Sequence, residues 1–417
     1  MDGADSAAER RAAEAVARRS YGKLVAYLSA RTRDVAAAED ALSEAFAAAL
    51  LDWPRHGVPR TPEAWLLTVA RRKMIDVARQ RRGMEAVADT LRVIGDLSFD
   101  DEASAPLPDE RLALMFVCAH PAISAEARAP LMLQTILGFD AGTIASAFLV
   151  APATMGQRLV RAKTKIRHAG IAFRLPERAE LPGRLDAVLD AIYAAFAEGW
   201  ADPAGTEARR RNLAEEAIWL GRLAASLLPQ EPEALGLLAL MLHAQSRRAA
   251  RRDAAGRYVP LDEQDTALWD GAMIDEAEAL LRGASALGKI GRFQLEAAVQ
   301  SAHAVRRHGG SADWHAIERL YDALATFTGS PVVAINRAIA ISRTCGPAAA
   351  LAALGAVADD PRLAQYQPYW AARAGLLEQL GDAAAADRAY ELAICLEPDA
   401  AVRDFLQQRR SGMGPLR

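Results

Sequence analysis

Residues 137–167 read LGFDAGTIASAFLVAPATMGQRLVRAKTKIR, and their spacing predicts two short helices joined by a turn. Ile144, Ala145 and Phe148 give the first helix an apolar face. Pro152 suits the first position of the second helix, where its missing N–H costs nothing. Apolar residues of the second helix recur at intervals of three and four, so they share one face: Met155, Leu159, Ala162 and Ile166.

The cationic residues of the second helix lie on its other faces: Arg158, Arg161, Lys163, Lys165 and Arg167. An α-helix fits the major groove of DNA, where cationic side chains can reach phosphates and guanine edges. The stretch therefore predicts a helix-turn-helix with a basic tail. The alternative is a solvated amphipathic helix with an accidental run of charge.

The composition predicts a folded, helical, multidomain protein. The chain has 417 residues, of which 52% are hydrophobic and 25% charged, which is ordinary for a soluble protein. This length exceeds one typical core, so two to four domains are expected. Alanine, the best helix former, is abundant, and alternating runs of Val, Ile and Thr are nearly absent. We therefore expect an all-α fold.

The cysteine spacing and the absence of familiar motifs exclude several classes of function. Cys118, Cys345 and Cys395 are far apart and match no disulfide framework or zinc spacing, which predicts a cytoplasmic location. Cys118 and His120 alone cannot fill a zinc shell. The chain shows no signal-peptide pattern, no bilayer-length apolar run, no phosphate loop and no nucleophile elbow. We expect a protein that is not an enzyme, uses no cofactor or metal, and has no membrane contact.

Charge is unevenly distributed along the chain. Residues 1–82 and 126–178 are basic, the latter with eight Lys or Arg against three Asp or Glu. Residues 83–125 are acidic, and so, mildly, are residues 179–417, with 25 Lys or Arg against 31 Asp or Glu. Two separated basic blocks suit two contacts on one polyanion.

The first basic block predicts a helix over residues 39–51, with Glu39, Asp40, Ser43 and Glu44 opposite an apolar face. That face comprises Leu42, Ala45, Phe46, Ala49 and Leu50. Three prolines and a glycine then predict a loop over residues 54–62. A second helix restarts after Thr61, a good N-cap, with Pro62 at its first position. We expect Trp65 of this helix to lie in the core. The later part of the helix is rich in cations: Arg71, Arg72, Lys73, Arg79, Arg81 and Arg82.

The C-terminal half predicts helix after helix. Residues 370–398, WAARAGLLEQLGDAAAADRAYELAICLEP, have Leu-Gly at a turn, small alanines and a closing proline, a pattern that resembles a tetratricopeptide repeat. A partial second copy lies near residues 331–352, and a generic helical hairpin is the alternative. The expected domains are residues 10–82, an acidic linker over 83–108, residues 109–176 and residues 181–417.

A basic run in the C-terminal half has two interpretations. It comprises His243, Arg247, Arg248, Arg251 and Arg252, and Gln264, Asp265 and Trp269 follow it. The run is either a ligand or partner site or a solvated helix end.

Together, the first 178 residues resemble the bacterial extracytoplasmic-function (ECF) group of sigma factors. Residues 38–46 look like the helix of that family that binds core RNA polymerase, and residues 65–82 look like its promoter-melting and minus-ten-reading helix. Residues 137–167 look like its minus-35-reading domain. Ser43 and Gly156 depart from the family pattern. The block 118–121, the segment 170–176 and the helical C-terminal half resemble the subgroup that carries a tetratricopeptide-like extension.

The resemblance implies a function and three sets of residues. Core polymerase would contact Glu39, Asp40, Glu44 and Phe46. The minus-ten element would contact Arg71, Arg72, Lys73, Asp76, Arg79, Arg81 and Arg82. The minus-35 element would contact Thr154, Gln157, Arg158, Arg161 and Lys165. The loop over residues 53–62 would cradle an unstacked base.

The implied function is a sigma factor that directs promoter-specific initiation, with a fused C-terminal domain that regulates it. Its partners would be core RNA polymerase, promoter DNA, and a protein or ligand at the repeat-like domain. The alternative is a dimeric helix-turn-helix regulator with a tetratricopeptide sensor that binds an operator.

Overall fold

The computed structural model describes residues 20–81, 109–148, 150–177, 180–200 and 208–412, and it confirms the predicted all-α class. Within these ranges the chain forms helices and no strand, apart from one isolated bridge between Arg252 and Tyr258. Two compact units are found, residues 1–199 and 200–417. None of the described helices has the length and apolar character that crossing a membrane requires.

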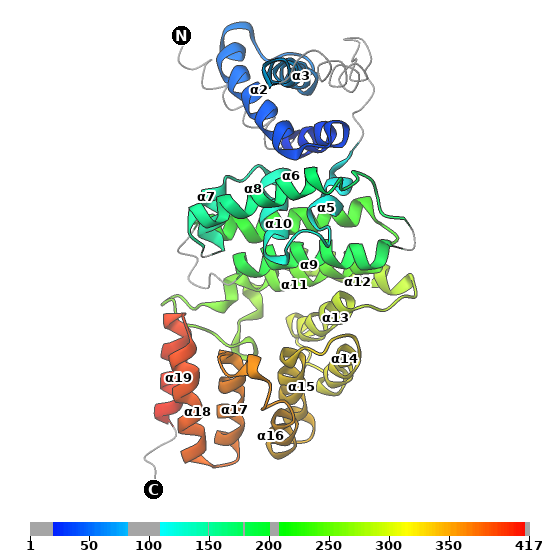
Figure 1. The fold of residues 1–417 in the computed structure, drawn as a ribbon. Helices are drawn as coiled ribbons and strands as arrows, with labels where there is room; N and C mark the ends of the chain where they lie inside the picture. Colours follow the sequence, from blue (N-terminus) through cyan, green and yellow to red (C-terminus); the bar gives the residue numbers. More distant parts are fainter. Residues whose placement is uncertain (1–19, 82–108, 149, 178–179, 201–207, 413–417) are drawn as a thin grey trace. The chain divides into compact units, whose positions relative to one another are not determined.

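The first unit opens with helical residues 20–32, followed by α2 (Val35–His56) and α3 (Pro62–Arg81) (Figure 1). Asp34 caps α2, since its side chain accepts a hydrogen bond from the N–H of Ala37 at 3.1 Å. Packing of α2 on α3 brings the rings of Trp53 and Trp65 edge to face, with centroids 5.6 Å apart. Trp53 is fully buried and Trp65 half-buried.

The predicted loop over residues 54–62 is shorter than expected, because α2 continues through Pro54 to His56. A proline in the last turn removes only one helical N–H, and the N–H of Gly57 still closes the helix on the carbonyl of Trp53. Trp53 therefore belongs to the core of the helix pair and not to a base-cradling loop. Leu50, predicted to lie on the apolar face, is 46% exposed.

Over the described residues from 109 onward, the first unit contains five helices. They are α5 (Arg111–Cys118), α6 (Ala125–Leu137), α7 (Ala141–Ala147), α8 (Pro152–His168) and α9 (Leu181–Trp200). The guanidinium of Arg184 in α9 donates to the carbonyl of Phe116 in α5 at 2.9 Å. Helix α9 clusters with this unit up to Gly199, although the sequence placed residues 181 onward in the C-terminal domain. The expected linker over 83–108 lies outside the described residues, as do residues 10–19.

Two glycines allow the first described helix to lie against α6. Gly22 faces the carbonyl of Ile136 so closely that a Cβ would lie 2.1 Å from its oxygen. Gly138, which ends α6 at a φ of +74°, lies against the ring of Tyr21. The backbone of α6 thus approaches residues 21 and 22 more closely than any larger side chain allows.

We expect Gly22→Ala to destabilise the first unit by about 3 kcal/mol, because overpacking against backbone cannot be relieved by a side-chain rotation. Gly156→Ala is the matched control. Gly156 lies inside α8 with nothing within 4 Å of an added Cβ, so the gain in helix propensity should stabilise the protein by about 0.5–1 kcal/mol. Urea unfolding followed by circular dichroism measures both. Equal effects of the two substitutions would contradict the close approach.

The second unit begins with α10 (Ala208–Leu227), α11 (Pro232–Ser246), α12 (Gly271–Ala286) and α13 (Arg292–Ala304). Helix α11 is buried almost all round and packs on both α12 and α13. Glu233 ties α11 to the start of α13, because its carboxylate accepts the N–H groups of Phe293 and Gln294. Between α11 and α12 the chain runs through three short 3-10 turns: η1 (Arg248–Arg251), η2 (Leu261–Glu263) and η3 (Thr266–Leu268).

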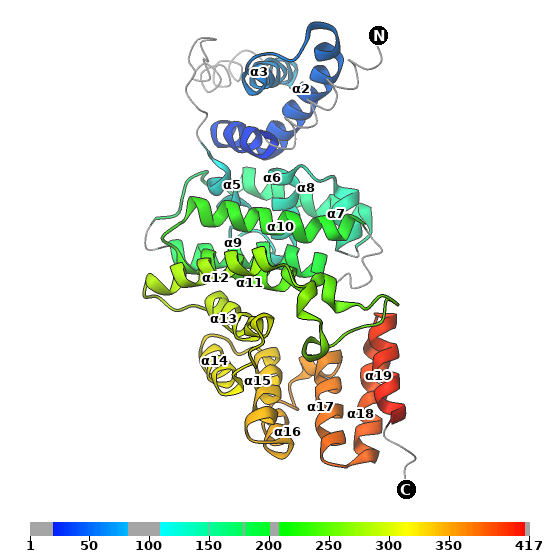
Figure 2. The ribbon, with the colours of Figure 1, turned by 180° about the vertical axis from the view of Figure 1, so that it is seen from behind.

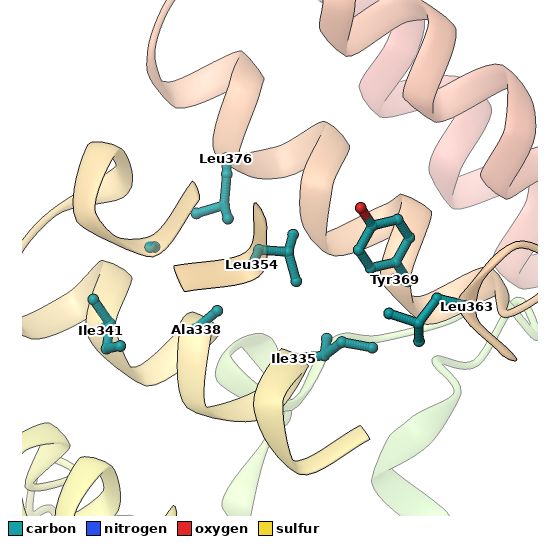
Figure 3. Close-up of a cluster of buried hydrophobic side chains, with 8 residues drawn as sticks. Ile335, Ala338, Ile341, Leu354, Leu363, Tyr369 and Leu376 are labelled. Atoms are coloured by element: carbon teal, nitrogen blue, oxygen red, sulfur yellow. The ribbon is translucent and has the colours of Figure 1, made fainter. Parts of the chain in front are cut away.

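Helices α14 (Trp314–Phe327), α15 (Pro331–Thr344), α16 (Pro347–Gly355), α17 (Gln367–Gln379), α18 (Ala383–Leu396) and α19 (Ala400–Gly412) complete the unit. Each packs on the next (Figure 2). One core lies between α15, α16 and α17 around Leu354 and Tyr369 (Figure 3). A second lies between α17, α18 and α19, and a third between α13, α14 and α15. The turn of the predicted repeat falls between α17 and α18, where Gly381 has a φ of +79° and Asp382 caps α18.

Candidate nucleic-acid interface

Helices α7 and α8 form the predicted pair, joined by a short turn. Asp140 caps α7 by accepting the N–H and the hydroxyl of Thr143, and these hydrogen bonds lower the pKa of its carboxyl. Pro152 is the first residue of α8. The predicted apolar face of α8 is buried, together with Ile144 and Ala145 of α7: Met155, Leu159, Ala162 and Ile166.

The opposite face of α8 is polar and exposed. Four of the five residues expected at the minus-35 element are exposed on it, at intervals of three and four: Thr154, Gln157, Arg161 and Lys165. The fifth, Arg158, is half-buried and pairs with Glu126 of α6 at 3.1 Å. The structure therefore leaves Arg161 and Lys165 as the cations of this group that face solvent most freely.

Two other cations of α8 point toward α2. Lys163 forms an ion pair with Glu39, and the two side chains are only 15% and 8% exposed. Arg167 pairs with the capping residue Asp34 at 3.4 Å. Burial raises the pKa of Glu39 above its ordinary value of 4.5, and the Lys163 ammonium opposes that shift. Glu39 therefore does not present its carboxylate at the surface.

We expect Lys163→Met to lower the free energy of unfolding by about 3 kcal/mol near pH 7, because it leaves the Glu39 charge buried without a partner. The folded variant then holds a proton on Glu39 at pH values where the unfolded chain has released it. Its stability therefore falls as the pH rises above about 4.5, and the deficit shrinks toward acid. Urea unfolding from pH 5 to 8 measures this. Adding Glu39→Gln should restore most of the loss, and a deficit independent of pH would contradict the pairing.

The remaining residues expected at the polymerase lie along α2. Asp40 and Glu44 are exposed, one helical turn apart, and Phe46 is half-buried with its ring 6.3 Å from that of Tyr21. Glu44 pairs with Lys73 of α3 at 2.8 Å, and this partner raises the pKa of Lys73. The exposed acidic surface of α2 is therefore Asp40 and Glu44.

Helix α3 carries the residues expected at the minus-ten element. Arg72, Lys73 and Asp76 are exposed and Arg71 is half-buried. Arg79 and Arg81 lie within the bounds of α3, and Arg82 lies outside the described residues. The cations Arg72 and Lys73 follow directly after a stretch of α3 that contains the buried residues Leu66, Leu67 and Ala70.

Cys118 and His120 do not form a metal site in the structure. Cys118 is fully buried beside the hydroxyl of Thr135, and burial raises the pKa of its thiol to about 12. His120 accepts the N–H of Ala122 on its Nδ1 at 3.1 Å. Both side chains thus serve local packing and turn formation.

The sequence did not reveal three contacts that organise this region. These are the capping of α2 by Asp34, the ion pair of Glu126 with Arg158, and the ion pair of Lys163 with Glu39. Asp34 carried a readable signal, since an Asp directly before an alanine-rich helix is a common N-cap. The ion pairs of Lys163 and Arg158 join residues that are far apart in the chain, so no local sequence pattern predicts them.

Comparisons with known proteins agree with this arrangement. Residues 16–83 match the family model for sigma-70 region 2, and residues 184–285 match a family of unknown function (DUF6596). The chain is 39% identical over 398 residues to an uncharacterized protein of Rhizobium meliloti (strain 1021), an alignment that covers 94% of this chain and 92% of that protein. No solved structure matches the chain.

A sigma-70 region 2 at the N-terminus supports a sigma-70 family factor, with a role in transcription initiation alongside RNA polymerase and promoter DNA. The chain belongs to the same family as the Rhizobium meliloti protein.

Proposed function

We propose that the protein is an ECF-type sigma factor. Helix α2 binds core RNA polymerase, α3 melts and reads the minus-ten element, and α8 reads the minus-35 element. One observation carries the proposal: the sigma-70 region 2 match over residues 16–83 shares a compact unit with a helix pair whose second helix exposes a polar, cationic face.

The exposed face of α8 has the chemistry that groove reading requires. A helix in the major groove uses its early turns to reach base edges, and its later cations to neutralise phosphates. Thr154 and Gln157 lie in the first turns of α8, Arg161 in the middle, and Lys165 near the end. The buried opposite face, packed in the same unit, holds the helix in place.

The C-terminal unit, we propose, modulates this activity in the way a separate regulatory protein would. Its net charge is negative, with 27 acidic against 24 basic residues over 200–417, which disfavours a second DNA contact. Its helices α14 to α19 each pack on the next around three hydrophobic cores, an arrangement that suits a tetratricopeptide-like protein-binding domain. The partner would be the sigma domains, polymerase or a further protein.

The second candidate function is a dimeric helix-turn-helix regulator that binds an operator. Such a protein needs a reading helix like α8, but it needs neither an acidic α2 nor a basic α3. The region 2 match covers both of those helices, so it favours the sigma factor.

Co-purification from cells tests the proposal most directly. The tagged full-length chain should bring down core RNA polymerase, and the purified pair should initiate run-off transcription on the DNA upstream of the gene for this protein. Core polymerase alone is the control. Specific DNA binding without polymerase binding would favour the operator-binding alternative and contradict the sigma assignment.

A chain ending at Gly199 should fold and bind polymerase but show reduced promoter activity. The end is placed there because α9 contributes Leu185, Val188 and Ile192 to the buried residues of the first unit. Run-off transcription at equal protein concentration compares it with the full chain. Equal activity in every condition, including with cell extract added, would contradict a regulatory role for the second unit.

A further inference from the structure

The basic run that follows α11 is not a solvated helix end. His243 is 2% exposed, Gln264 is 7% exposed and Trp269 is 6% exposed. The last turn of α13 adds His303, which is 8% exposed, and the 3-10 turn that follows it adds Arg306. We call His243, Arg247, Trp269, His303 and Arg306 the arginine–histidine cluster.

Arg247 carries a charge that its surroundings do not balance. Its Nη2 donates to the side-chain oxygen of Gln300, a neutral acceptor, and its Nη1 is buried without a hydrogen-bond partner. Throughout the part of the chain that the structure describes, no carboxylate forms an ion pair with it. Its strongest charged neighbours are Arg251 and Arg306, both cations, and burial together with these neighbours lowers the pKa of Arg247 to about 10.

Three other cations nearby have partners of their own. Arg252 pairs with Asp399, and Arg307 pairs with Asp275. Arg306 donates to the carbonyls of Leu261 and Asp262 at 2.6 and 2.9 Å. These carbonyls satisfy the N–H groups of Arg306 but leave its positive charge in place beside Arg247.

The cluster also holds more hydrogen-bond donors than it uses. The buried Nε1 of Trp269 has no acceptor, and Nδ1 of His303 has no partner. Nε2 of His243 lies 3.5 Å from the carboxylate of Glu278 without forming a hydrogen bond. Burial, and then the charge of Arg247, lower the pKa of both histidines to about 4, so near pH 7 they are neutral and each keeps one N–H.

These side chains lie near one another. The guanidinium of Arg306 lies 5.6 Å from the centre of the Trp269 ring, and Trp269 shares a small apolar core with Ala250 and Ala304. Arg247 acts electrostatically on both His243 and His303. Arg247 and Arg306 keep part of their side chains at the surface although the Nη1 atom of Arg247 is buried, so the cluster lies at the edge of the unit.

Buried charges in proteins are normally paired, and buried donors normally have acceptors. We infer that the arginine–histidine cluster binds a small oxyanion, a phosphate or carboxylate group, which neutralises Arg247 and accepts hydrogen bonds from the unpartnered donors. The guanidinium of Arg247 offers the forked geometry that both groups accept. The site lies wholly in the second unit, and its ligand binding does not depend on the transcriptional role.

Calorimetric titration of the full-length chain with inorganic phosphate tests this, with succinate as the carboxylate arm and sodium chloride at matched ionic strength as the control. We expect saturable binding of phosphate, succinate or both, and the arm that responds identifies the ligand class. Arg247→Gln should weaken the binding at least tenfold, while the matched control Arg388→Gln, an exposed arginine on α18, should not change it.

A thermal melt of each variant without ligand separates a binding role from a structural one. Because Arg247→Gln removes an unbalanced charge, the ligand-free variant should melt no lower than the unsubstituted protein. A lowered melting midpoint with unchanged anion binding would overturn the inference. So would the absence of saturable binding in both arms, which would leave ordered water as the partner of the donors.

Discussion

Joint replacement of Asp40 and Glu44 by arginine will remove binding to core RNA polymerase and leave the fold intact. Both side chains are exposed on one face of α2, and a basic partner surface would then meet like charge. Such juxtapositions cost several kcal/mol across an interface, so affinity should fall at least about a hundredfold. Co-purification of polymerase with the tagged variant, and circular dichroism of the same sample, give the two readouts.

The fold should survive because the lost pair is weak. Glu44 contacts Lys73 where both side chains are about half exposed, and exposed pairs contribute roughly 0.2–1 kcal/mol. The matched control is Asp359→Arg with Glu391→Arg, two exposed acids in the second unit. Glu39 is left out because its burial with Lys163 would confound binding with stability. Undiminished recovery of polymerase by the α2 variant would contradict the role of this helix.

The second large effect is expected on α8. Arg161 is exposed, and among the residues that the structure describes its Nε donates only to the carbonyl of Gln157 on its own helix. Arg161→Ala should cost about 1–3 kcal/mol of promoter binding and relax the preference for one base of the minus-35 element. Lys165→Ala should weaken binding evenly across sequences and reduce the salt slope by about 1, as loss of a phosphate contact does.

Arg158→Ala is the comparison within the same helix. Because Glu126 holds the side chain of Arg158, the Arg158→Ala variant should lose less base preference than the Arg161→Ala variant. The Glu126→Ala variant should free Arg158 to contact DNA. Binding to upstream fragments that carry single minus-35 substitutions, measured at several salt concentrations, separates these effects. Indifference of binding to both Arg161→Ala and Lys165→Ala would exclude α8 as the reading helix.

The all-α class and the helix pair over residues 141–168 could be predicted because they rest on local patterns. The buried set of α8 follows from spacing alone, and Pro152 marks its start. The course of α2 past Pro54 was mispredicted because a proline near a helix end removes a bond without ending the helix. The burial of Trp53 depends on α3, a neighbour that no local pattern in α2 reveals.

The sequence predicted which residue types form the candidate site, but it did not predict which of these side chains are exposed at the surface. Of the five residues expected at the minus-35 element, four are exposed. The fifth, Arg158, is half-buried and forms an ion pair with Glu126 of another helix. Glu39 was grouped with Asp40 and Glu44 by charge, but a helix turns each residue by about 100°, and only Glu39 meets Lys163. The tests of polymerase binding and of promoter binding therefore use the residues that the structure leaves at the surface.

The Glu39–Lys163 pair also sets a geometric condition on promoter binding. By their names, the two promoter elements lie about 25 base pairs apart, which is about 85 Å along B-form DNA. A side-chain ion pair holds α8 against α2, and α2 packs directly on α3. Helices joined in this way cannot contact both elements at once.

The chain has enough length to resolve this conflict. A fully extended chain as long as the stretch that connects α3 to α5 would span about 90 Å. Under the proposed function, reading both elements therefore requires α8 to separate from α2 and the ion pair to break. The free energy of that contact is then a cost of converting the compact protein to its promoter-bound form. Binding to core polymerase and DNA together must offset this cost.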